Sequence, residues 1–283
     1  MTPLRNKMIN AMQLRGFSPR TQSSYLYTVQ ALARYYERPP DQLSVEDVQA
    51  FLQFLAVDKQ LSPSTCRLHM HGIRFLFVQV LALQAFQTQY HIPKAKQRIP
   101  QLLTHSDVQA LMAAPHNFKH RILLMTCYGC GLRLSELTHL KVSHIDGERK
   151  LLRVEQGKGA KDRLIPISPS LLTLLRKYWQ EEHPVLWLFP GRDSSQPLSK
   201  TSPQKVYRQA HQHAGINKRG GIHALRHAYA THQLEAGLPV HHLQRYLGHR
   251  NIQSTLRYVH WLPTALTQKQ PADLLAQMEV NHV

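Results

Sequence analysis

The sequence has few cysteines and no long hydrophobic run. It contains 3 cysteines in 283 residues, too few for a disulfide framework, so a reducing cytosolic compartment is expected. Near the N-terminus, Arg5, Lys7 and Arg15 stand where a secretory peptide has its apolar core, so no signal peptide is expected. The most apolar stretch, residues 73–86, is interrupted by Arg74 and is shorter than the ~20 residues that cross a bilayer.

Acidic residues are also scarce. The chain has 17 Asp and Glu against 35 Lys and Arg, a formal net charge of +18, while its hydrophobic fraction of 42% is enough to fill cores. Residues 1–100 hold 12 basic and 5 acidic residues, and residues 101–283 hold 23 and 12. This excess predicts a polyanionic partner, with nucleic acid preferred over a membrane surface. Because both parts are basic, we expect a clamp around the partner rather than a basic tail.

Hydrophobic periodicity predicts two domains. Residues 1–90 have apolar positions at helical spacing after each of three serine N-caps, which predicts a helical bundle. Residues 91–103 include two prolines and three basic residues and are expected to form an extended linker. Residues 104–263 are predicted to form a second, mostly helical domain, and residues 264–283 a final helix.

The second domain has one exception to its helical pattern. Residues 150–155 and 162–167 are short β-prone runs, and the glycines between them suit a hairpin turn. The predicted fold class is therefore mainly α, with a small antiparallel β-sheet inside the second domain.

Four motifs contain the residues that could do chemistry. Each has an ordinary structural explanation when it is taken alone. An Arg at a helix start pairs with a Glu three residues later, a turn Lys is solvated, and a Tyr near a helix end is packed. The motifs are GLRLSEL with Arg133, GKGAK with Lys158, HALRH with His223 and Arg226, and LGHRN followed by STLRYVH with His249 and Tyr258.

Together these residues form a coherent chemical set. Two guanidiniums bind the non-bridging oxygens of a phosphodiester and stabilise a pentavalent transition state. Imidazoles and an ammonium donate protons, and a phenol attacks. The pKa of a free Tyr is about 10, and the surrounding cations are expected to favour the phenolate of Tyr258. Lys161 and Arg163, beside the hairpin turn, are interpreted as phosphate contacts or solvated charges.

Two pairs of residues are compatible with a metal or redox site, but each has a simpler explanation. His223 and His227 are four residues apart on a predicted helix, as zinc ligands often are, but the Glu of the zincin pattern and a third ligand are missing. Cys127 and Cys130 form a Cys-x-x-Cys pair that closes an apolar helix, and the sequence has no second pair. Buried small side chains are therefore favoured for both cysteines.

The order and spacing of the motifs resemble the tyrosine recombinase (phage integrase) family, most of all its compact two-domain, Xer-like and element-borne members. The resemblance covers nearly the whole chain. It implies a DNA core-binding domain at residues 1–90 and a catalytic domain at residues 104–263. In the family, a tail such as residues 264–283 docks on a neighbouring subunit, although an amphipathic tail could equally fold back on its own domain.

The resemblance also implies roles for the residues of the motifs. Tyr258 attacks the scissile phosphate and forms a 3′-phosphotyrosyl link, which frees a 5′-hydroxyl. Arg133 and Arg226 hold the phosphate and its developing charge, and Lys158 protonates the leaving 5′-oxygen.

The two imidazoles complete the set that the resemblance implies. His223 assists proton transfer around the nucleophile, and His249 hydrogen-bonds a non-bridging oxygen. No cofactor, ATP or obligatory metal is implied, and the expected partners are duplex DNA carrying a recombination site and further copies of the chain, in a tetramer. Two alternatives stay open: a type IB topoisomerase-like strand transferase and a DNA-binding relic without catalysis.

Overall fold

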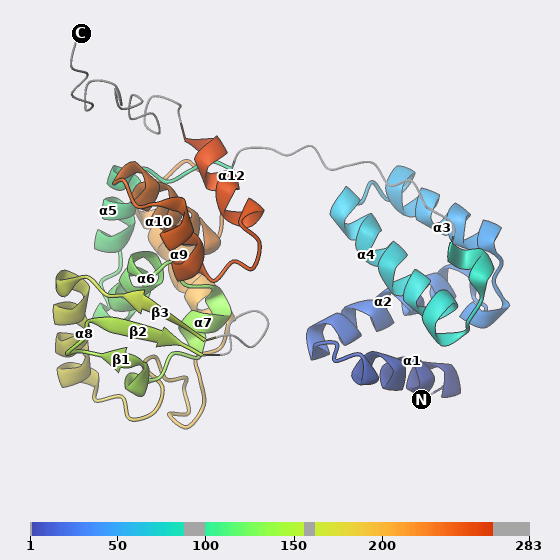
Figure 1. Ribbon diagram of the computed structural model, residues 1–283, viewed down its shortest axis with the longest axis horizontal. Coiled ribbons are helices and arrows are strands. Elements are labelled where there is room, and N and C mark those ends of the chain that lie inside the picture. The colour runs from blue at the N-terminus through green and yellow to red at the C-terminus, as the bar shows by residue number, and fades with distance from the viewer. Residues whose placement is uncertain (1, 88–99, 156–161, 263–283) are drawn as a thin grey trace, which may run out of the picture. The chain divides into compact units, whose positions relative to one another are not determined.

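The computed structural model describes residues 2–87, 100–155 and 162–262, and the chain divides into two compact units, Met1–Arg98 and Ile99–Val283 (Figure 1). Most of the predicted linker at residues 91–103 and the whole predicted tail helix at residues 264–283 lie outside the described residues. Each unit has its own hydrophobic core.

The N-terminal unit is helical, as predicted. Its helices are α1 (Pro3–Leu14), α2 (Pro19–Tyr36), α3 (Val45–Val57) and α4 (Pro63–Arg74), with 3₁₀ turns at Pro40–Gln42 and Gln84–Gln87 and a π-helical segment at Phe75–Val80. The hydroxyls of Ser18, Ser44 and Ser62 accept hydrogen bonds from the backbone N–H three residues later, which caps α2, α3 and α4. Glycine at position 72 lets α4 approach α2 closely, because a Cβ there would lie 2.0 Å from Thr28 Oγ1.

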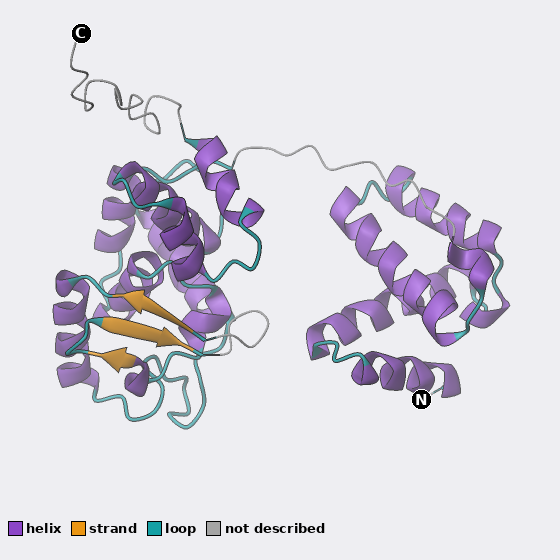
Figure 2. Ribbon diagram, viewed as in Figure 1, coloured by secondary structure: helices purple, strands orange, loops and turns teal. Residues whose placement is uncertain are grey.

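The C-terminal unit contains the predicted small sheet among helices (Figure 2). In chain order its elements are α5 (His105–Ala113), α6 (Phe118–Gly129), α7 (Leu134–Thr138), a 3₁₀ turn (Val142–His144), β1 (Ile145–Asp146), β2 (Leu151–Val154), β3 (Arg163–Pro166), α8 (Pro169–Glu182), α9 (Thr201–His213), α10 (His223–Glu235), α11 (Val240–Leu247) and α12 (Gln253–Trp261). The prediction of two antiparallel strands is confirmed, with Leu152 opposite Ile165. Strand β1 is an addition, too short to show alternation in the sequence.

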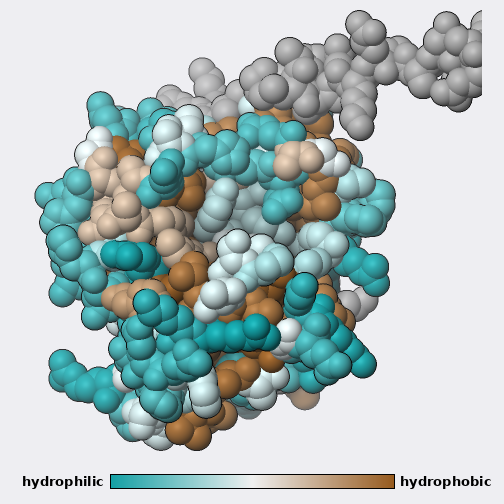
Figure 3. All heavy atoms as spheres, turned by 90° about the vertical axis from the view of Figure 1, so that its left-hand side faces the viewer, coloured by the Kyte–Doolittle hydropathy of each residue, from teal (hydrophilic) through white to brown (hydrophobic). Residues whose placement is uncertain are grey.

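Helix α6 runs through the middle of the C-terminal unit and is contacted by α8, α9 and α10 (Figure 1). Its residues Ile122, Leu123 and Leu124 are almost fully buried. This placement puts the C-terminal end of α6, and the turn that follows it, beside α10. On the face shown in Figure 3, hydrophilic residues, in teal, cover much of the surface and hydrophobic residues form separate patches. Among the described helices, none is long and apolar enough to cross a bilayer.

Candidate active site

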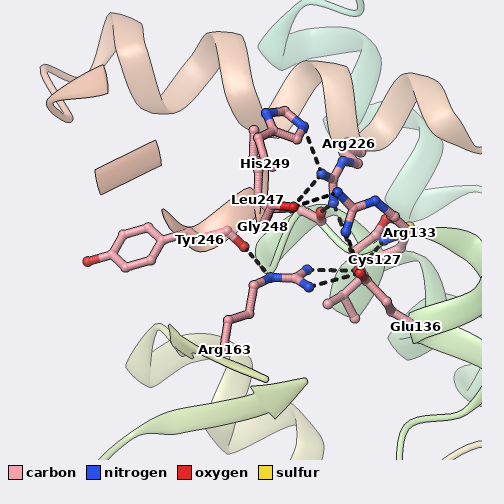
Figure 4. A network of polar contacts seen from close by, with 11 residues as sticks. Cys127, Arg133, Glu136, Arg163, Arg226, Tyr246, Leu247, Gly248 and His249 are labelled. Atoms are coloured by element: carbon pink, nitrogen blue, oxygen red, sulfur yellow. Dashed lines mark hydrogen bonds and ion pairs between the residues drawn. The ribbon is translucent and has the colours of Figure 1, made fainter. Parts of the chain in front are cut away.

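A buried carboxylate lies at the centre of the candidate site. Glu136, on α7, is 8% exposed and contacts three guanidiniums (Figure 4). Arg163 donates from its two terminal nitrogens to Oε1 and Oε2 at 2.8 and 2.7 Å. Arg133 donates to Oε1 at 2.7 Å and its backbone N–H to Oε2 at 2.8 Å, while Arg226 lies 3.9 Å from Oε2.

These cations keep Glu136 ionised. Burial alone would raise the pKa of the carboxyl, but the hydrogen bonds and charge of Arg163, with those of Arg133, lower it to about 2. The carboxylate is therefore negative at neutral pH, and it neutralises part of the charge that holds the guanidiniums apart. The ordinary structural explanation of the first motif, a pair between Arg133 and Glu136, is confirmed. This pair is one part of the larger ion cluster.

The end of α11 supplies the acceptors that aim the three arginines. The carbonyls of Tyr246, Leu247 and Gly248 accept hydrogen bonds at 2.7, 2.7 and 3.0 Å, from Arg163, Arg226 and Arg133 in that order. The last carbonyls of a helix lack partners within it, and its C-terminus favours cations. One helix end therefore orients all three guanidiniums.

Two glycines allow this close approach. Gly248 ends α11 with φ +63°, and a Cβ there would lie 3.0 Å from the Cδ of Arg163. Gly131 has φ +56°, and a Cβ there would lie 2.4 Å from the ring of Tyr229. The Gly131 carbonyl accepts a second hydrogen bond from Arg226 at 2.7 Å. Both positions need the left-handed backbone that glycine adopts without strain.

The second arginine of the set is buried. Arg226 is 4% exposed, and burial together with the charge of Arg133 lowers its pKa to about 10, so it remains protonated at neutral pH. Its Nη2 lies 3.1 Å from Nε2 of His249. Since a guanidinium only donates, His249 accepts at Nε2 and donates from Nδ1 to the Thr255 hydroxyl at 2.8 Å. Burial and the charges of Arg226 and Arg133 lower the pKa of His249 to about 3, so the ring is neutral at neutral pH.

Tyr258 lies in the same cluster, on α12. It is 3% exposed, and its ring lies parallel to that of His249, with centroids 6.3 Å apart. Its hydroxyl lies 3.1 Å from Nδ1 of His227. Burial raises its pKa, and the charges of Arg226 and Arg257 offset only part of that effect. The expectation that the cations favour the phenolate is therefore wrong for the site without substrate, because desolvation outweighs them.

The remaining predicted residues are less tightly placed. His223 is the first residue of α10 and is exposed, and it makes no hydrogen bond within the described part of the chain. Desolvation and the nearby Arg226 and Arg133 lower its pKa. Lys158 lies outside the described residues, between strands β2 and β3.

Three contributors were missed or misjudged from the sequence. Arg163 was interpreted as a phosphate contact or solvated charge, but its side chain is 7% exposed and is bound to Glu136. Glu136 was seen only as a partner for Arg133. The sequence suggested His227 only as a candidate zinc ligand. Its position one turn after His223 on the predicted helix was the signal that it could belong to the same site.

Both cysteines of the Cys-x-x-Cys pair are free and buried, as favoured above. Burial raises the pKa of both thiols to about 12, so they are protonated and unreactive at neutral pH.

One cluster among the described residues has metal-ligating side chains: His105, His232 and Glu235. The rings of His105 and His232 are stacked, with centroids 3.7 Å apart and planes 20° apart, so their in-plane lone pairs cannot meet at one ion. Both nitrogens of His232 are also engaged, by the Tyr128 hydroxyl and the Leu103 carbonyl. The cluster does not fit a metal ion.

Comparison with known proteins places both units in one family. The model of the "Phage integrase family" matches residues 101–264, and that of the "Phage integrase, N-terminal SAM-like domain" matches residues 4–85. A putative integrase/recombinase of Sinorhizobium fredii, y4qK, is 40% identical over 260 residues, which cover 92% of this chain and 84% of that protein. Tyrosine recombinase XerA of Thermococcus onnurineus is 32% identical over 252 residues, covering 87% of this chain and 86% of its own.

Solved structures share the fold. A lambda integrase (75–356) dimer bound to a COC′ core site matches with a TM-score of 0.73 at 19% identity, covering 89% of this chain and 95% of that one. The Tn1549 transposon integrase in complex with circular intermediate DNA matches with a TM-score of 0.72 at 18% identity, covering 91% and 95%. A crystal structure of XerA recombinase matches with a TM-score of 0.55 at 24% identity, covering 93% and 94%.

The buried pair of Arg163 and Glu136 should dominate the stability of this region. Removing Arg163 leaves the buried Glu136 carboxylate with Arg133 as its only directly bound guanidinium among the described residues, so Arg163→Met should lower the free energy of unfolding of the C-terminal unit by about 3 kcal/mol at pH 7. The pKa of Glu136 is depressed from 4.5 to about 2. Its contribution is therefore complete above pH 4.5, and it is lost as the pH falls toward 2.

Denaturant unfolding of the full chain between pH 3 and pH 7 measures this effect. The difference between Arg163→Met and wild type should shrink below pH 4.5. Arg153→Met, which removes exposed pairs with Asp162, just before β3, and with Glu155, serves as the control and should change stability far less. Equal effects of the two substitutions would contradict the assignment.

Proposed function

The chain belongs to the phage integrase family of tyrosine recombinases, enzymes that cleave and rejoin DNA strands, and we propose that Tyr258 is the nucleophile with which it does so. The attack forms a 3′-phosphotyrosyl link and frees a 5′-hydroxyl. The observation that carries the proposal is one connected cluster: Arg133 and Arg226 lie at the buried carboxylate, His249 contacts Arg226, and the ring of Tyr258 lies beside that of His249. A phosphodiester that meets this cluster has a nucleophile and two charge-stabilising donors beside it.

Arg133 and Arg226 bind the non-bridging oxygens of the scissile phosphate. Both are held at fixed carbonyl acceptors before substrate arrives, so little reorganisation is needed in the transition state. Arg133 also lines a hollow of about 440 Å³ whose walls include His139 and Lys141. This hollow leaves the side chain accessible from outside.

His249 binds a non-bridging oxygen in this proposal. In the structure its Nε2 accepts from Arg226, so the ring must gain a proton to become a donor. The negative charge of a phosphate raises the pKa of a neighbouring imidazole. Substrate therefore supplies the conditions in which His249 can donate. His223 assists proton transfer around the nucleophile.

Lys158 protonates the leaving 5′-oxygen. Its flanking strand β3 is tied to the arginine cluster through Arg163, which supports delivery of the hairpin to the same phosphate. Attack of a 5′-hydroxyl from a second strand reverses the chemistry, so strands are exchanged with the energy of the broken bond kept in the phosphotyrosine. The chemistry then needs neither ATP nor a metal.

The two family matches support a division of labour along the chain. Residues 1–90 form the core-binding domain, residues 91–103 the basic linker and residues 104–263 the catalytic domain, and the tail at residues 264–283 contacts a neighbouring subunit. The net charge of +18 is shared by both halves, which supports a grip on duplex DNA from both domains. A protein that acts on cellular DNA is expected in the cytoplasm, at the nucleoid of a bacterial-type host.

A nicked suicide DNA tests the nucleophile. The site is first recovered by sequencing the genomic DNA that the protein protects. The nick lets the short fragment that carries the freed 5′-hydroxyl diffuse away, so the covalent adduct accumulates. We expect an adduct that survives chelator and denaturing electrophoresis and is absent from Tyr258→Phe. Tyr246→Phe is the matched control and should keep the adduct, because Tyr246 enters the network only through its carbonyl. An adduct in Tyr258→Phe, or one that depends on magnesium, contradicts the proposal.

The assembly separates a recombinase from a type IB topoisomerase-like enzyme, which acts as a monomer. A lambda integrase tetramer bound to a Holliday junction shares the fold of this chain, with a TM-score of 0.71. Sedimentation of the protein with DNA carrying paired sites should give four copies of the chain per synapsed pair. One copy per site at every protein concentration, with cleavage intact, would favour the topoisomerase-like alternative. Absence of cleavage at recovered sites would favour the relic.

A further inference from the structure

The nucleophile has a contact to which the proposed function gives no role. His227, one residue after Arg226 on α10, places Nδ1 3.1 Å from the Tyr258 hydroxyl. Its ring is half-buried, 5.7 Å between centroids from that of Tyr258, and it meets the Trp261 ring edge-on at 5.5 Å. The imidazole is therefore held in position by α12 as well as by its own helix.

The protonation states allow the phenol to donate to this nitrogen. Burial raises the pKa of Tyr258, so the phenol keeps its proton at neutral pH. Burial, followed by the charges of His223, Arg226 and Arg257, lowers the pKa of His227 to about 4, so its ring is neutral. A neutral imidazole has one nitrogen with a free lone pair. With the ring proton on Nε2, Nδ1 accepts the phenol O–H.

The other groups around Tyr258 cannot take its proton. The guanidiniums of Arg226, Arg257 and Arg133 act on it electrostatically but can only donate. His249 has both ring nitrogens engaged, by Arg226 and Thr255.

His223, one turn earlier on α10, does not contact the phenol directly. It is exposed and makes no hydrogen bond to Tyr258 within the described residues. Among the imidazoles of the cluster, His227 is the one in contact with the nucleophile.

We propose that His227 is the catalytic residue that accepts the proton of Tyr258 as the phenol oxygen attacks phosphorus. The O–H bond breaks as its proton moves to Nδ1, the phenol oxygen forms the new P–O bond, and the bond from phosphorus to the 5′-oxygen breaks. The leaving oxygen takes its proton from another group, Lys158 in the proposed function. In the reverse step the imidazolium returns its proton to the tyrosine. The inference rests on Tyr258 being the nucleophile.

Substrate makes His227 a better base than it is alone. Without substrate, His227 with its pKa near 4 is a weak base, because burial and the neighbouring cations Arg226 and Arg257 oppose its protonation. A bound phosphate neutralises those cations and adds negative charge beside the ring, which raises the pKa of His227 toward its ordinary range. Proton acceptance is therefore coupled to the presence of the phosphate.

The test replaces the base but keeps its hydrogen bond. His227→Asn puts an amide near the position of Nδ1, able to accept from the phenol but unable to take its proton. Single-turnover cleavage of the suicide DNA at saturating protein should fall by about 10²-fold, within the usual range for loss of a general base. DNA affinity and thermal unfolding should change little. His227→Gln serves the same test if the Asn variant does not fold.

A fluorinated tyrosine separates proton acceptance from a structural role. Trifluorotyrosine at position 258, introduced by codon suppression, ionises at lower pH and needs less help from a base. It should restore most of the cleavage lost in His227→Asn. A DNA with sulfur at the bridging 5′ position, whose leaving group needs no proton, should not rescue His227→Asn.

The outcomes also distinguish this inference from the proposed function. If wild-type protein forms the adduct and His227→Asn cleaves at the wild-type rate, the base assignment is overturned and Tyr258 remains the nucleophile. A defect in His227→Asn that the fluorinated tyrosine leaves unchanged also overturns it. If the adduct survives in Tyr258→Phe, the proposed function itself fails.

Discussion

The ion cluster at Glu136 is the interaction on which the candidate site depends. Three guanidiniums with like charge would repel one another in a buried site, and their desolvation would be costly without an anion. One carboxylate, with its pKa lowered to about 2, binds two of them directly and lies 3.9 Å from the third. The carbonyls at the end of α11 take up the remaining donors of Arg133, Arg163 and Arg226. Together, carboxylate and helix end fix positive charge in place before any phosphate is present.

The same cluster connects parts of the chain that are distant in sequence. Arg163 comes from β3, Glu136 from α7, and the accepting carbonyls from the end of α11. The tie through Arg163 attaches the root of the β2–β3 hairpin, which carries Lys158, to the groups proposed to bind phosphate. A single buried pair therefore serves two purposes: it stabilises the C-terminal unit, and it sets the start of β3 relative to Arg133.

Much of the fold and part of the site could be predicted from the sequence. The three serine caps and the glycine turn are local signals, so α2, α3, α4 and the β2–β3 pairing followed from them. The motif order identified Arg133, Arg226, His249 and Tyr258, which the structure brings together. The burial of Arg163 against Glu136 could not be predicted from the sequence, because an Arg at the start of a strand has the same local sequence pattern whether it is solvated or buried. The pKa of Tyr258 was misjudged because burial depends on how α12 packs, which the local sequence does not specify.

A single measurement tests the claim that Glu136 organises the arginines for catalysis. Glu136→Gln keeps the shape of the side chain and removes its charge, so Arg133 and Arg226 lose the anion that holds them. Single-turnover cleavage of suicide DNA at saturating protein should then fall by about 10²-fold, the loss expected when one transition-state donor is misplaced, while DNA affinity stays within about threefold. Cleavage at the wild-type rate in Glu136→Gln would contradict the account, because the guanidiniums would then be positioned without the carboxylate.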